Sequence, residues 1–138
     1  MGAPLSDATL AAAGTVEAVA QAARAWREGL AARIAGGEAS ASITAAITAC
    51  NDAATRRLIA LVGAEQPFAG AGACWIALGS EGRGEQTLAS DQDNALVFAD
   101  GPAADATRER LVPWAARVND ALDACGLARC RGDIMAGN

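Results

Sequence analysis

Apolar residues recur three and four positions apart through the first half of the chain, and this spacing constrains the fold more than any other feature. Such stripes mark one face of an amphipathic helix. The first stripe ends before the glycine pair Gly36-Gly37, and the second begins near Ser40. They consist of Val16, Val19, Ala23, Trp26 and Leu30, and then of Ile43, Ile47, Cys50, Ala54, Leu58 and Leu61. Residues 1–66 are therefore expected to form an antiparallel helix pair.

The residue pattern of the sequence changes after Pro67. Residues 74–78 form a short, mostly apolar run that predicts a buried strand, and residues 94–98 predict a second strand. A third amphipathic helix is predicted over 103–125, kinked or broken by Pro113.

The last segment, residues 130–136, is predicted to be a third strand. The fold class is then α+β, with the helix pair followed by a core over residues 67–138. That core would hold a small mixed β-sheet in the order ααβ(α)βαβ. The two parts are expected to pack as a single compact unit.

Composition and charge exclude several classes of function. The chain has 138 residues and a net charge of −5, and all eleven basic residues are arginine. This charge repels polyanions, so a long nucleic acid is not an expected partner. Without histidine the chain cannot build a Ser-His-Asp or Cys-His triad. It has neither a membrane-length apolar run nor a basic N-terminal leader, so a cytoplasmic protein without membrane contact is expected.

The four cysteines contain no C-x-x-C pair. They are Cys50, Cys74, Cys125 and Cys130, and each lies in or beside an apolar stretch. Zinc sites with four cysteines generally use close pairs. We therefore interpret all four as reduced packing residues.

Two carboxylates and a glycine-serine pair carry the clearest chemical signal. Asp91 and Asp93 open the second predicted strand, where alternate side chains point to the same face and Gln92 points away. Two neighbouring carboxylates are tolerated where a divalent cation neutralises them, and hard oxygen ligands suit Mg²⁺ or Mn²⁺. Gly79-Ser80, at the end of the first strand, could bind phosphate through its backbone and hydroxyl.

The same residues have a purely structural interpretation. Ser-Asp-x-Asp-Asn is also typical of a turn or cap before a strand, and a bare D-x-D is a common pattern. The residues alone leave both interpretations open.

The wider stretch GSEGRGEQTLASDQD, residues 79–93, resembles the signature of the DNA polymerase β-like nucleotidyltransferase superfamily. It is most similar to the domain shared by the PII-protein uridylyltransferases and a group of signal-transduction proteins. NDAATRR at 51–57 and GDIMAGN at 132–138 resemble that group as well. Gln92 and Asn94 stand where the superfamily usually has apolar residues, a feature that the closer group shares. Residues 67–138 would then be the nucleotidyltransferase core.

The resemblance implies roles for four residues. Gly79 and Ser80 would bind the phosphates of a nucleoside triphosphate, and Asp91 and Asp93 would be the catalytic metal ligands. The metal would be Mg²⁺ or Mn²⁺, and a histidine-free site can perform this chemistry because positioning and metals do most of the work.

Other residues of the matching stretches have less defined roles. Arg83 would contact the triphosphate, or would pair with Glu85 and shape the loop. Arg56 and Arg57 could reach a phosphate or form an ordinary solvated helix face. Asp133, the acidic residue of the last predicted strand, is the candidate for a third metal ligand.

The implied function is transfer of UMP or AMP from a nucleoside triphosphate to a hydroxyl, with a PII-like regulatory protein as a possible acceptor. A non-catalytic nucleotide-sensing module is the alternative, and a small-molecule nucleotidyltransferase is a third hypothesis. Relatives often carry CBS, cyclic-nucleotide-binding or C-terminal helical domains. The resemblance therefore implies that this chain is one unit of a longer protein.

Overall fold

The part of the chain that the structure describes is built from three long helices, two short ones and a small antiparallel sheet. The computed structural model describes residues 7–63 and 72–138. The elements in chain order are α1 (Asp7–Ala12), α2 (Val16–Ala35), α3 (Ser40–Val62), β1 (Cys74–Ala77), α4 (Gly79–Gly82), β2 (Asn94–Val97) and α5 (Ala104–Ala124). The α+β class predicted from the sequence is confirmed. The predicted boundary at residues 66 and 67 lies outside the described residues.

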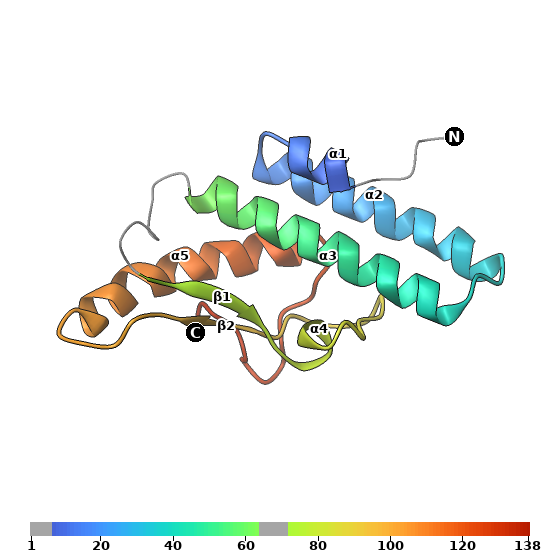
Figure 1. Cartoon of the computed structure of the whole chain (residues 1–138). Helices are drawn as coiled ribbons and strands as arrows, with labels where there is room; N and C mark the ends of the chain where they lie inside the picture. Colours follow the sequence, from blue (N-terminus) through green and yellow to red (C-terminus); the bar gives the residue numbers. More distant parts are fainter. Residues whose placement is uncertain (1–6, 64–71) are drawn as a thin grey trace.

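The helix α3 lies between α2 and α5, and it contacts both (Figure 1). The apolar stripes of the sequence point into these contacts, because Val19, Leu58 and Leu122 have no measurable exposure. Burying three such side chains contributes roughly 1.5–3 kcal/mol each, relative to leaving them in water. The helices therefore form one shared core rather than an isolated pair.

The short helix α1 precedes α2, and the helical structure breaks between them. Thr15 has an extended backbone, and its hydroxyl oxygen accepts a hydrogen bond from the N–H of Ala18 at 3.1 Å. This is the geometry of an N-cap, so α2 begins at Val16. Its end agrees with the glycine pair, since Gly36 caps the helix and Gly37 has a positive φ of 79°.

Within residues 7–63 and 72–138 the sheet has two strands, β1 and β2, which pair in antiparallel fashion. Trp75 lies opposite Leu96 in the register, and both pack against the helical core. The indole of Trp75 meets that of Trp114 on α5 edge to face, with ring centroids 6.0 Å apart. The sheet is therefore fixed to α5 through one of its faces.

Two expectations for this region are wrong, and one of two alternatives for α5 is settled. The β1 residues are half-buried or exposed rather than buried, because a two-stranded sheet lying on helices has one face covered. Residues 130–136 form turns instead of a third strand: Asp133 has a φ of 56°, and its N–H bonds back to the Cys130 carbonyl at 3.2 Å. The helix α5 continues through Pro113 without the break that was the alternative to a kink.

The prediction that all four cysteines are packing residues is right for some of them and wrong for Cys74. Cys50 and Cys125 are buried, and burial raises the pKa of the Cys125 thiol to about 11. Cys74, in contrast, is exposed on β1. Among the described residues, which include all four cysteines, there is no disulfide. Within the same residues, no helix combines the length and apolar character needed to cross a membrane.

Candidate functional site

The turn after β1 places a very short helix at the end of the strand. Leu78 is extended, and Gly79 then turns the chain with a positive φ of 53° into α4. The N–H of Gly82 donates to the Leu78 carbonyl at 2.8 Å. A Cβ at Gly82 would lie 2.7 Å from the Ala77 carbonyl oxygen, so the sequence needs glycine there. The N–H groups before Gly82, those of Gly79, Ser80 and Glu81, come too early in α4 to have an acceptor within the helix.

Asp91 and Asp93 lie just before β2 and follow the alternation expected of an extended segment. Gln92 has no exposure and Asn94 is 1 % exposed, whereas both aspartates are half-buried. Successive residues of extended backbone project to opposite sides. The two carboxylates therefore project away from the core that holds Gln92, as the sequence predicted.

Gly79 and Asp93 are in direct contact. The N–H of Leu78 donates to the Asp93 carbonyl at 2.8 Å, which extends the strand pairing past Ala77. A Cβ added to Gly79 would lie 3.1 Å from the carboxyl carbon of Asp93. The structure thus brings the glycine-serine turn and the second aspartate together, although they lie 14 positions apart in the sequence. Ser80, half-buried, is the next residue of the same turn.

A third carboxyl group, Glu81, lies at the same place and was not predicted. It is only 5 % exposed, and it accepts a hydrogen bond from the Asp93 backbone N–H. Desolvation by burial raises its pKa to about 7; that hydrogen bond opposes the shift, and the nearby carboxylates of Asp52 and Asp93 add to it. Its Oε2 is buried without a hydrogen-bond partner among the described residues.

Part of the polar face of α3 is covered by the loop before Asp91, whereas Arg56 on the same face is exposed. Asn51 is 2 % exposed, and its Oδ1 accepts from Arg27 at 3.3 Å. The same guanidinium donates to the Leu88 carbonyl at 2.8 Å, so α2, α3 and the loop before Asp91 are joined. Asp52, a half-buried residue of the same face, has the carboxylate that helps to raise the pKa of Glu81. An amphipathic pattern shows that such a face is polar but does not show which segment covers it.

The arginines of the matching stretches have protein partners. Arg83 pairs with Glu85 at 2.8 Å on an exposed surface, which corresponds to the loop-shaping alternative. Arg56 pairs with Asp52 at 3.4 Å. Arg57 donates to the Ala13 carbonyl at 2.6 Å and so ties α3 to the loop after α1.

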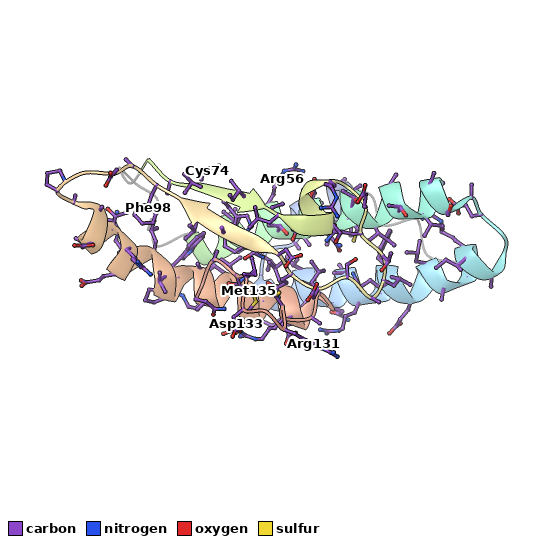
Figure 2. The ribbon with its side chains drawn as sticks, turned by 90° about the horizontal axis from the view of Figure 1, so that it is seen from below. Arg56, Cys74, Phe98, Arg131, Asp133 and Met135 are labelled. Carbon is purple, nitrogen blue, oxygen red and sulfur yellow. The ribbon has the colours of Figure 1, made fainter. Side chains whose placement is uncertain are left out.

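Asp133 is exposed in the C-terminal turns. Figure 2 shows it on the α5 side of the ribbon, near Arg131, while α4 lies on the side of β1. Across residues 7–63 and 72–138, no group of three or more histidine, cysteine, aspartate or glutamate side chains is arranged to hold a metal ion. Asp133 as a third ligand therefore stays a prediction. The oxygen donors of Asp91 and Asp93 fit Mg²⁺ or Mn²⁺ in chemical type, as a two-carboxylate site.

A short strand, a glycine-serine turn and an aspartate pair before the next strand are the parts expected of a nucleotidyltransferase core. The family model described as "Putative nucleotidyltransferase DUF294" matches residues 20–138, and the chain belongs to this family. Neither a curated protein nor a solved structure matches the chain.

Proposed function

We propose that this chain is a catalytic nucleotidyltransferase domain that uses Mg²⁺ or Mn²⁺ to transfer UMP or AMP from a nucleoside triphosphate to a hydroxyl. The observation that carries the proposal is the contact between Gly79 and Asp93. It places a turn suited to phosphate beside a carboxylate suited to a divalent cation, within a chain of this family. A protein acceptor of the PII type, and partner domains of the CBS or cyclic-nucleotide-binding kind, are the expected biological context.

Each residue of the site has a distinct role in this proposal. Asp91 and Asp93 would hold the divalent cation, which lowers the cost of charge building up on the phosphates. The N–H groups of the first turn of α4 and the Ser80 hydroxyl would donate to phosphate oxygens. Gly79 lets a phosphate and the Asp93 carboxylate share one turn, because it adds no side chain there.

The proposed reaction forms one O–P bond and breaks another. The acceptor oxygen attacks the α-phosphorus, a new O–P bond forms, and the bond to the bridging oxygen of the β-phosphate breaks. Pyrophosphate leaves, and the hydroxyl proton passes to solvent. Aligning these atoms is the main contribution that a protein makes to such a transfer.

A nucleotide-sensing module without catalysis is the second candidate. Two observations favour it: the aspartate pair has no third acidic partner arranged for a metal among the described residues, and Arg83 is engaged by Glu85. Such a module would bind metal and nucleotide in the same turn without releasing pyrophosphate.

The test supplies the full chain with labelled UTP or ATP, Mg²⁺ and candidate acceptors. We expect pyrophosphate release that Asp91→Ala and Asp93→Ala each abolish. Asp105→Ala, an exposed carboxylate on α5, is the matched control and should keep the activity. Metal-dependent binding without turnover would support the sensor, and labelling of a small hydroxylated acceptor alone would support a small-molecule enzyme. Absence of any metal-dependent nucleotide binding would contradict all three.

A further inference from the structure

Three amide side chains are buried together behind the aspartate pair. Gln92, Asn94 and Asn119 are each at most 1 % exposed. The Asn119 amide donates to Oε1 of Gln92 and to Oδ1 of Asn94, both at 2.9 Å. In return, the Gln92 amide donates to the carbonyls of Asn119 at 3.0 Å and Leu127 at 2.9 Å. Buried amides are costly unless they are paired. Both amide groups of Gln92 and Asn119 are paired, whereas Nδ2 of Asn94 has no partner among the described residues.

The C-terminal segment closes the same network. The N–H of Ala136 donates to Oδ1 of Asn94 at 2.9 Å, and the N–H of Gly137 donates to Oδ1 of Asn119 at 3.0 Å. Gly137 packs directly on α5, since a Cβ there would lie 2.5 Å from Cα of Ala116. Asn119 thus joins α5, the aspartate segment and the chain's last turn.

The backbone on either side of Asp93 is fixed as well. The N–H of Gln92 donates to the Ala128 carbonyl at 2.9 Å, and that of Asn94 donates to the Ile134 carbonyl at 3.2 Å. Both acceptors belong to the segment after α5. The aspartate segment is therefore held along one backbone edge by the segment after α5.

The apolar pattern of β2 does not set this register. The stretch NALVF is apolar at both odd and even positions after Asn94, so hydrophobic alternation does not distinguish its two faces. A slip of one residue would turn Gln92 outward and direct both aspartates into the core. A network with directional donors and acceptors discriminates against that slip, whereas apolar residues of similar volume would not.

We propose that Asn119 is a positioning residue of the nucleotide site: through Gln92 and Asn94 it sets the register that keeps Asp91 and Asp93 out of the core and holds Asp93 against the α4 turn. The proposal rests on the proposed function, because it assumes that these aspartates bind the metal–nucleotide complex. It also explains why polar residues flank Asp93.

The test measures binding of MnATP and of MnUTP to the full chain by isothermal titration calorimetry. Asn119→Asp keeps the side-chain shape and the acceptor for Gly137, but it replaces both amide donors with a carboxylate oxygen. We expect binding to weaken at least tenfold. Gln92→Met removes the same link from the other side with similar length, and it decides the question where Asn119→Asp does not fold.

The control is Val118→Ala, which opens the core at the neighbouring, fully buried position of α5 without touching an amide. It should leave the affinity within twofold even if it lowers stability more. Wild-type affinity in both folded amide variants, with binding lost in Asp93→Ala, would overturn the positioning role alone. Unchanged binding in Asp91→Ala and Asp93→Ala would instead overturn the proposed function.

Discussion

Replacing Glu81 by glutamine is the perturbation with the most clearly defined consequence. The carboxyl is buried on α4 beside Asp93, and one of its oxygens has no hydrogen-bond partner among the described residues. Glutamine keeps the acceptor for the Asp93 N–H and removes the charge. The variant therefore isolates the free energy of burying that charge.

The magnitude follows from the shift in pKa. Burial raises the pKa of Glu81 from 4.5 to about 7, so between these values the folded chain holds a proton that the unfolded chain has lost. Stability contributed by this group is complete below pH 4.5 and is lost as the pH rises through 7. At about 1.4 kcal/mol per unit of pKa, the loss at pH 8 is on the order of 3 kcal/mol.

The assay is urea denaturation of metal-free protein between pH 4.5 and pH 8, followed by circular dichroism. The stability of Glu81→Gln relative to wild type should increase across this range by about 3 kcal/mol. Glu85→Gln, which removes an exposed carboxylate of the same loop, is the control and should show a difference under about 1 kcal/mol. A difference between Glu81→Gln and wild type that does not change with pH would refute the assigned burial and charge environment.

Three further substitutions test separate parts of the structure by the same denaturation assay. Gly79→Ala should lower the free energy of unfolding by about 1–2 kcal/mol, because alanine is strained in the left-handed backbone. It should also weaken MnATP binding, because the new Cβ meets Asp93. Unaltered binding would show that the close approach of Gly79 to Asp93 does not matter for the site. Thr15→Ala should cost about 1 kcal/mol through loss of the α2 cap, and no loss would mean that the cap is not formed in solution. Leu58→Ala, at a position with no exposure, should cost about 2–5 kcal/mol; a value under about 1 kcal/mol would place Leu58 outside the core.

Much of the helical structure could be predicted because its signals are local. The stripe of α3 and its start at Ser40 are confirmed, as is the end of α2 at the glycine pair. The prediction of a third strand is wrong for a physical reason that the sequence pattern does not show. Its residues are compatible with a strand, but Asp133 adopts a left-handed backbone that curls the chain.

The parts of the candidate site that could be predicted are those that follow a local residue pattern in the sequence. The alternation of Asp91, Gln92 and Asp93 indicated which side chains share a face, and the burial of Gln92 agrees with it. Glu81 could not be found in this way, because its burial depends on tertiary packing around α4. Asn119 looks like an ordinary polar residue on a helix until its tertiary partners are known.

In the proposed site, Asp91 and Asp93 hold a divalent ion beside the Gly79-Ser80 turn. The most direct measurement is paramagnetic broadening of backbone amide NMR signals during titration with Mn²⁺ and nucleotide. We expect the signals of these four residues to broaden first and the Asp93→Ala substitution to remove the effect. Broadening centred on the exposed carboxylates of α5, or broadening at the turn that survives Asp93→Ala, would contradict it.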